Sequence, residues 1–241
     1  MSPRPRAVSG FALAPQRVAR IVRVMLASTD AMIFGLFFAV FAGVMMLIIW
    51  SARRERRRTA ENLDGLASRL GLDHVTANQP WWSGEHRVEG RRDGRRVRFW
   101  TYTTGSGKSR RHWVAVGVEP RRAGGFTFRL EPQGLATRLA EWFGAKEITV
   151  GEARFDAEWF VRTNAPEVFG AALVPEIRAR LTAARERGAG GDFKLEEGWV
   201  CYTEQGRFAD EDAIRKLESL LPVLHDLADA AEVCADAVTV R

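Results

Sequence analysis

The sequence predicts an α+β fold, in which a single N-terminal transmembrane helix precedes a mostly antiparallel sheet covered by helices. Three observations lead to this prediction. Residues 31–50 contain no charged side chain, residues 84–130 alternate between apolar and polar side chains, and residues 210–230 repeat apolar residues at helical spacing. The first pattern is typical of a membrane span, the second of half-buried strands and the third of helices packed on a sheet.

Residues 1–30 form a basic tail, which holds five arginines and no acidic residue before Asp30. Pro15 suits the first turn of a helix, and the apolar residues after it follow the i, i+3, i+4 rule. We therefore expect an amphipathic helix on an anionic membrane surface. An organelle transit peptide and a biological start at Met25 or Met32 are the alternatives. The apolar positions are Val18, Ile21, Val22, Met25 and Leu26.

The transmembrane helix is predicted over residues 31–50, whose 20 residues carry no charge. At about 1.5 Å of rise per residue they span a hydrocarbon layer of about 30 Å. A buried core helix of this length usually keeps a polar face. A cleaved signal peptide fits less well, because its apolar region holds about 7 to 15 residues and an A-x-A-like site follows it. We expect an uncleaved anchor.

Small residues recur every fourth position on one face of this helix, at Ala31, Gly35, Ala39 and Gly43. Such a face lets two helix backbones approach closely, which predicts a homodimer. The alternative is that small residues are simply common in membrane helices.

The orientation follows from the arginines that flank the span. The richer side tends to stay in the cytoplasm, and it is the C-terminal side here. We expect a single-pass protein of the inner membrane with a cytoplasmic C-terminal domain. The presence of only two cysteines agrees with a reducing compartment. The arginines after the span are also candidate contacts for anionic lipid headgroups. They are Arg53, Arg54, Arg56, Arg57 and Arg58, against Arg17, Arg20 and Arg23 before it.

The net charge of +6 does not describe the soluble part, because residues 59–241 hold 26 basic and 28 acidic residues. Residues 87–122 alone carry +8, interleaved with aromatic residues. This composition could stack nucleic acid bases. The favoured interpretation is one solvated and one buried face of a sheet, so nucleic acid is not an expected partner. The aromatic residues concerned, with one histidine, are Phe99, Trp100, Tyr102, His112 and Trp113.

Residues 51–71 predict a basic juxtamembrane helix that ends at Gly71. The soluble α+β domain is expected over residues 72–232, followed by a tail at 233–241. It should open with a four-stranded antiparallel meander over 84–130, with turns at Asp93-Gly94 and at 104–107. The later elements are a helix at 134–143, strands at 146–150 and 158–163, a bent helix at 166–187 divided at Pro175, a hairpin at 193–203 and a helix at 210–230 kinked at Pro222.

Residues Gly107, Lys108 and Ser109 read GKS, but a phosphate-binding P-loop needs glycine five positions before the first of them, where this chain has Tyr102. The loop is also expected between two strands rather than before a helix. The remaining possibility is that Lys108, Arg110 and Arg111 hold an anion such as a lipid phosphate in loop 105–111. The alternative is a polar hairpin turn.

No catalytic, cofactor-binding or metal-binding residue is predicted, and no cofactor. The histidines are scattered and form no metal-ligand motif. The cysteines lack a local partner for nucleophilic chemistry, and the carboxylate pairs are more typical of turns and solvated strand faces. The residues considered are His74, His86, His112, His225, Cys201, Cys234, Asp156 with Glu158, and Glu196 with Glu197.

One run resembles a known group of proteins. Residues 155–161 read FDAEWFV, followed by Asn164-Ala165-Pro166 and Leu173-Val174-Pro175. This pattern, with the W-x-Y-x-T-G-x-G-K run ending at Lys108, is similar to bacterial membrane-anchored proteins that carry a domain of unknown function. The resemblance implies a membrane anchor with an α+β domain, and it brings no catalytic residues.

The sequence therefore predicts a non-catalytic interaction or regulatory domain that a single span holds at the membrane surface, with an unidentified protein partner. The alternative is an anion-binding or lipid-binding domain, enzymatic or not, that uses loop 105–111.

Overall fold

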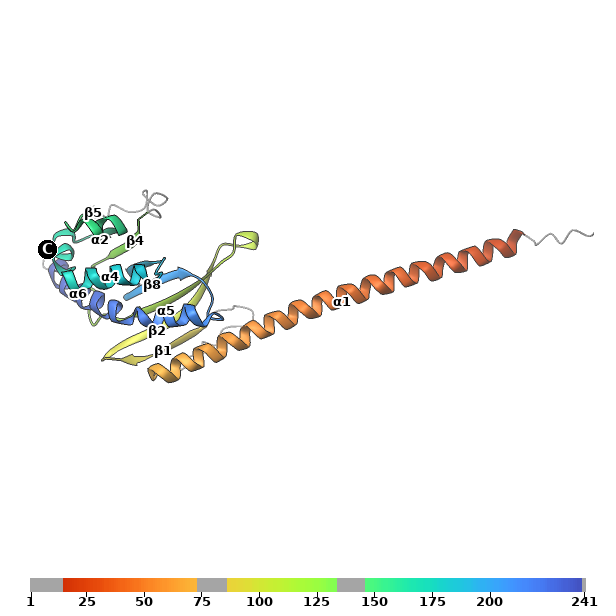
Figure 1. Ribbon diagram of the computed structural model, residues 1–241, viewed down its shortest axis with the longest axis horizontal. Helices are drawn as coiled ribbons and strands as arrows, with labels where there is room; N and C mark the ends of the chain where they lie inside the picture. The colour runs from red at the N-terminus through yellow and green to blue at the C-terminus, as the bar shows by residue number, and fades with distance from the viewer. Residues whose placement is uncertain (1–14, 73–85, 134–145, 240–241) are drawn as a thin grey trace, which may run out of the picture. The chain divides into compact units, whose positions relative to one another are not determined.

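The computed structural model describes residues 15–72, 86–133 and 146–239. The chain divides into two compact units, Met1–Arg54 and Glu55–Arg241, each of which is described by itself. The described residues of the first unit are helical, since helix α1 covers Pro15–Leu70 and continues into the second unit (Figure 1).

The predicted membrane span lies in α1. Among the described residues, one helix is long and apolar enough to cross a membrane, and none of its apolar window is buried. The large apolar side chains from Phe34 to Trp50 are exposed. By length and composition this segment fits a membrane anchor or a signal sequence.

The second unit contains one sheet of eight strands, and every neighbouring pair of strands is antiparallel. This confirms the predicted fold class. The strands are β1 (Arg87–Arg92), β2 (Arg95–Thr104), β3 (Arg111–Val118), β4 (Phe128–Pro132), β5 (Lys146–Ile148), β6 (Trp159–Thr163), β7 (Asp192–Glu196) and β8 (Trp199–Gln205), in the order β1-β2-β3-β8-β7-β4-β6-β5.

The predicted four-stranded meander is wrong in its last strand. Strands β1 to β3 follow one another, but β8 pairs with the free edge of β3 and β4 lies between β7 and β6. The reason is the burial of β8, whose residues are all buried except the last. The backbone N–H and C=O groups of a buried strand need hydrogen-bond partners along both of its edges, and β3 and β7 supply them.

The helices begin where prolines or an aspartate predict. Helices α3 (Pro166–Ala172) and α4 (Pro175–Glu186) confirm the division at Pro175. The Asp210 side chain caps α5 (Glu211–Ser219) by accepting a hydrogen bond from the Asp212 amide at 3.0 Å. The kink expected at Pro222 is a break, because α6 (Leu221–Thr239) starts there as a separate helix. The short helix α2 (Ala153–Glu158) was not predicted.

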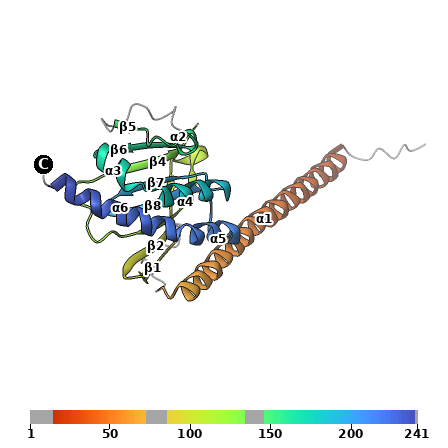
Figure 2. The ribbon, with the colours of Figure 1, turned by 60° about the vertical axis from the view of Figure 1, so that its left-hand side comes forward.

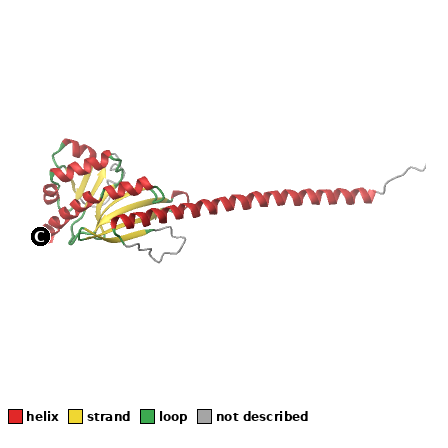
Figure 3. Cartoon of the chain, turned by 60° about the horizontal axis from the view of Figure 1, so that its bottom comes forward, coloured by secondary structure: helices red, strands yellow, loops and turns green. Residues whose placement is uncertain are grey.

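The core lies between one face of the sheet and the helices (Figures 2 and 3). Val97 and Phe99 are fully buried on that face, whereas Arg98 and Trp100 alternate with them and are half-buried on the other. The predicted alternation along β2 is confirmed. The core includes the last turns of α1, with Leu63 and Leu66 fully buried, so the compact unit starts before residue 72. It also continues past 232, because residues 233–239 belong to α6. The helix expected at 134–143 lies outside the described residues.

Candidate functional site

The candidate anion-binding loop is the turn between β2 and β3, which we call the hairpin tip (residues 105–111). A single 3-10 turn at Gly107–Ser109 forms it, and the Ser106 carbonyl accepts hydrogen bonds from the amide and hydroxyl of Ser109 at 3.1 and 2.8 Å. Gly105 has φ +76°, and a Cβ there would lie 2.5 Å from the Ser109 carbonyl oxygen. The tip joins two strands, as expected, so its amides do not form a phosphate-binding helix N-terminus.

The cations of the hairpin tip have no acidic partner among the residues that the structure describes. Lys108, Arg110 and Arg111 are exposed, and none forms an ion pair with a described residue. Three positive charges are therefore available to an external anion.

The arginines that follow the span are the second candidate group, called the juxtamembrane cluster (Arg53, Arg54, Arg56, Arg57 and Arg58). All five are exposed, and the guanidinium of Arg54 lies 5.4 Å from the centroid of the Trp50 ring. Glu55, the acid within this run, forms an ion pair with Arg207 at 2.7 Å. An arginine from the domain thus neutralises the acid that would otherwise offset the cluster.

Arg207 also connects the juxtamembrane cluster to the hairpin tip. It follows Gly206, whose amide donates to the carbonyl of His112 at 3.1 Å. His112 lies in β3, directly after the tip. The end of the domain that begins at Glu55 therefore carries the hairpin tip and the last three arginines of the cluster, which are separated by about fifty residues in sequence. Sequence reasoning missed Arg207, because no local pattern marks its partner.

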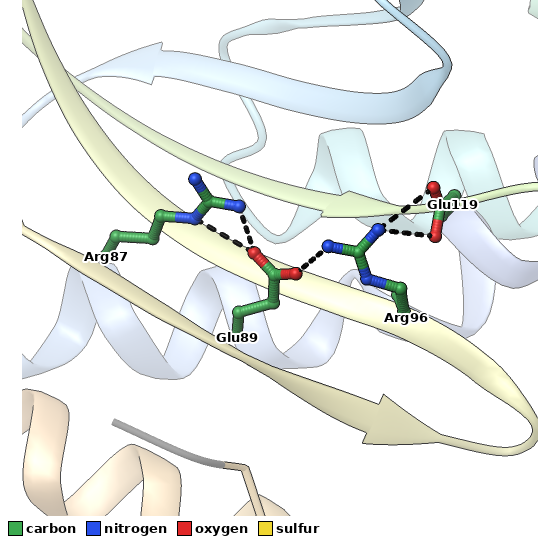
Figure 4. A network of polar contacts seen from close by, with 4 residues as sticks. All are labelled: Arg87, Glu89, Arg96 and Glu119. Carbon is green, nitrogen blue, oxygen red and sulfur yellow. Dashed lines mark hydrogen bonds and ion pairs between the residues drawn. The ribbon is translucent and has the colours of Figure 1, made fainter. Parts of the chain in front are cut away.

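Two arginines on the open face of the sheet, Arg87 and Arg96, are engaged with acids instead. Figure 4 shows Glu89 between the guanidinium groups of Arg87 and Arg96, and Arg96 also contacts Glu119 at 3.2 Å. Burial acts to raise the pKa of Glu89, but the hydrogen bonds and charges of the two arginines outweigh it and hold that pKa below its usual value. The charges of this network therefore balance one another within the fold.

Arg98 is held by aromatic rings. Its guanidinium carbon lies 4.3 Å from the centroid of Trp100 and 4.2 Å from that of Trp199. Burial lowers the pKa of Arg98 below its usual value. Trp100 packs on Gly117, where a Cβ would lie 3.1 Å from the indole ring. The predicted aromatic set is therefore divided, because Phe99 is in the core and Trp100 is already stacked within the protein.

The remaining aromatic pair lies on the strands below the tip. Tyr102 and Trp113 are stacked, with ring centroids 6.0 Å apart and planes 8° apart. The indole N–H of Trp113 donates to the hydroxyl of Thr104 at 2.8 Å. His112 lies beside Thr103, with 3.4 Å between the Thr103 hydroxyl oxygen and the His112 Nδ1.

The two cysteines are buried and poorly suited to nucleophilic chemistry. Burial raises the pKa of the Cys201 thiol to about 12 and that of Cys234 to about 11, so both remain protonated near neutral pH. Cys234 was expected in a tail and lies in helix α6. Among the described residues, no group of three His, Cys, Asp or Glu side chains could hold a metal ion.

The carboxylate pairs have structural partners. Asp156, which precedes the strand predicted at 158–163, lies in α2, where its carboxylate accepts hydrogen bonds from the amides of Val150 and Gly151 at 2.9 and 3.0 Å. The unpredicted helix arises because this carboxylate closes the turn that precedes it. Glu196 forms an ion pair with Lys194.

The small-residue face of the span is partly described. No described side chain lies within 4 Å of the position that a Cβ would take at Gly35 or Gly43. Both positions are therefore open to a partner helix, while the side chain of Ala31 is outside the described residues.

A cavity of about 650 Å³ lies on the helical side of the domain and was not predicted. Its lining mixes both signs of charge, and Arg180 pairs with Asp226 across it. Burial lowers the pKa of His225, which also contributes to the lining, below its usual value. The lining comes from α1, the β1–β2 turn, α4, α5 and α6, so no local motif could have indicated it.

Comparison with known proteins gives limited information. No family model matches this chain, and no curated protein matches it. Among solved structures, the mycobacterial trehalose monomycolate transport factor A, TtfA, is similar with a TM-score of 0.49 and 12% identity, over 74% of this chain and 94% of that chain. This similarity is too weak to transfer an activity or a partner. The resemblance of residues 155–161 to membrane-anchored bacterial proteins stays a prediction.

Proposed function

We propose that this chain is a single-pass membrane protein whose α+β domain serves as a non-catalytic interaction or regulatory domain at the membrane surface. The observation that carries the proposal is the order of three features in α1. Exposed apolar side chains come first, the exposed arginines of the juxtamembrane cluster follow, and core residues of the folded domain come last. An apolar helix whose side chains no protein surface covers is stabilised by lipid.

The state of the polar groups supports a binding role over chemistry. Nucleophilic or acid–base catalysis uses groups with a pKa near neutral and an accessible surface. Here the thiols are buried and protonated, and Glu89 and Asp156 are held by hydrogen bonds within the fold. These groups therefore stabilise the folded domain.

Orientation follows from the arginine excess after the span, which favours a cytoplasmic domain and an inner-membrane location in a bacterium. The resemblance of residues 155–161 to bacterial membrane-anchored proteins agrees with this. The open Gly35 and Gly43 positions support a homodimer through the span.

Membrane extraction with reporter fusions tests the proposal. The full chain, tagged at the C-terminus, should stay in the membrane pellet after an alkaline carbonate wash and should keep its full length. Reporters at the two termini should place the C-terminus in the cytoplasm. Release by carbonate, or a product shortened at its N-terminus by the length of the span, would overturn the anchor.

Isolation of the detergent-solubilised chain with its partners tests the interaction role. A defined protein should co-purify in fixed ratio with the full chain. Recovery of the same proteins with a control that keeps residues 1–54 but carries an unrelated soluble domain would count against a role for the α+β domain.

The second candidate function is binding of an anion or lipid through the hairpin tip. The free cations of the tip favour it.

A further inference from the structure

We propose that the hairpin tip is a second contact between the domain and an anionic membrane surface, in addition to the juxtamembrane cluster. This inference rests on the proposed function, because it requires the chain to be anchored. It names the anionic headgroups of the bilayer as the partner of Lys108, Arg110 and Arg111.

The base of the hairpin lies at the end of the domain that follows the membrane span. Arg58 follows Trp50 by eight residues, which is about 12 Å of helical rise, so the end of the domain that carries Arg57 and Arg58 is tied to the membrane. The ion pair of Glu55 with Arg207 and the hydrogen bond of Gly206 to His112 place the base of the hairpin at that same end.

The exposed cations that have no acidic partner among the described residues are distributed unevenly over the domain. Most described cations of the domain form ion pairs, and the network around Glu89 is an example. The cations that are exposed and lack an acidic partner among the described residues gather at the end that carries Glu55, where Glu55 itself is neutralised. At this end they are Arg57, Arg58, Lys108, Arg110 and Arg111; elsewhere they are Arg91, Arg121 and Arg187.

The hairpin carries aromatic side chains below its tip, and the backbone of the tip is held by hydrogen bonds. Tyr102 and Trp113 stack directly beneath the cations, and aromatic rings with polar groups are enriched at membrane–water interfaces. The Ser106 and Ser109 contacts fix the backbone of the tip, so little conformational freedom is lost when it meets a surface.

The expected effect follows from the number of cations. Each basic residue near an anionic leaflet contributes a similar favourable free energy, and three of them correspond to about a hundredfold in the equilibrium between the docked and the free tip. This interaction weakens as salt is added, because headgroup attraction is screened over about 8 to 10 Å at physiological ionic strength.

The test places a fluorophore on the tip of the full chain in lipid nanodiscs. A Ser106→Cys variant supplies the labelling site, and the buried native thiols, with their raised pKa, should remain unlabelled. Nanodiscs with a headgroup quencher contain either 30% phosphatidylglycerol or phosphatidylcholine alone. Strong quenching is expected with the anionic lipid only. The Lys108→Ala, Arg110→Ala, Arg111→Ala variant should lower the docked-to-free ratio about a hundredfold.

A matched control removes the same charge elsewhere, with Arg91→Ala, Arg121→Ala and Arg187→Ala, and should quench as the parent does. Equal quenching in both lipids, equal loss in the control, or a tip that remains unquenched in a chain that has inserted would overturn this inference alone. Protection of an unquenched tip by single-stranded nucleic acid would overturn it in favour of a different partner. A chain that fails to enter the nanodisc would instead contradict the proposed function.

Discussion

Two groups of basic side chains in this domain differ in what neutralises them. Arg87, Arg95 and Arg96 lie on the sheet with carboxylates in contact, and their charges are balanced within the fold. Lys108 and Arg110, at the hairpin tip, face solvent without an acidic partner among the described residues. This difference shows that net charge is a poor guide to function, because only charged side chains that form no ion pair within the fold are available to a partner. Substitutions in the two groups should therefore affect different measurements.

The largest effect on stability is expected at Arg95. Its side chain is 6% exposed and contacts Asp229 at 2.5 Å and Glu232 at 2.7 Å. Arg95→Met removes the charge and leaves the Glu232 carboxylate largely buried without its cation, which should cost about 3 kcal/mol. Thermal unfolding of the full chain in detergent should show a Tm lower by about 6 to 12 °C.

The control for this variant is Arg122→Met. Arg122 pairs with Asp236 at 2.9 Å, but its side chain is 69% exposed, so its Tm should stay within about 2 °C of the parent. Equal losses in the two variants would show that burial of the ion pair is not what matters.

A smaller loss is expected at Arg98, where two indole rings take the place of a carboxylate. Arg98→Leu removes cation–π contacts with Trp100 and Trp199 and should cost about 1 to 2 kcal/mol. Unfolding should be followed by near-ultraviolet circular dichroism, whose tryptophan bands should also change in the folded state. An unchanged Tm with unchanged bands would mean that the rings do not hold this arginine.

The next effect depends on pH, through Glu89. Its pKa in the folded protein is below its usual value of 4.5, so its stabilisation is complete above about pH 4.5 and is lost as the pH falls through the folded-state pKa. Glu89→Gln should destabilise the domain by about 1 kcal/mol at pH 7. The difference from the parent should shrink on acidification below pH 4.5. A gap that is constant from pH 7 to pH 3 would contradict the role of this carboxylate.

The smallest effect on stability is expected at the tip itself. Lys108→Ala should change the free energy of unfolding by less than about 0.5 kcal/mol, because the side chain is exposed and unpaired. The same variant should weaken quenching of the tip by anionic nanodiscs. A large loss of stability would place Lys108 among the paired cations and so remove the contrast between the two groups.

Much of the fold could be predicted because local signals were strong. Prolines at 166 and 175 start α3 and α4, and Asp93-Gly94 turns the first hairpin with φ of +52° and +77°. The meander failed at β4 because strand order depends on which edges find buried partners, and alternation along one strand carries no such information. Helix α2 was missed because it is only six residues long, and the hydrogen bonds of the Asp156 carboxylate to the amides of Val150 and Gly151 follow no sequence motif.

The candidate site divides in the same way. The residues of the hairpin tip and the juxtamembrane cluster could be named from composition and turn chemistry. Their placement at one end of the domain depends on Arg207 and Gly206, which follow β8 and have no recognisable motif. The cavity near His225 depends on even more distant segments and gave no signal at all.

The apolar span, the basic loop at 105–111 and the α+β class could all be predicted from the sequence, because each follows from residues adjacent along the chain. Which arginines are neutralised depends on the folded structure, since an ion pair such as Arg95 with Glu232 joins residues far apart in sequence. Pairing depends on distances across the fold of a few ångströms, and no periodicity encodes them. Of the exposed cations without an acidic partner among the described residues, we assign those at the end that carries Glu55 to the membrane.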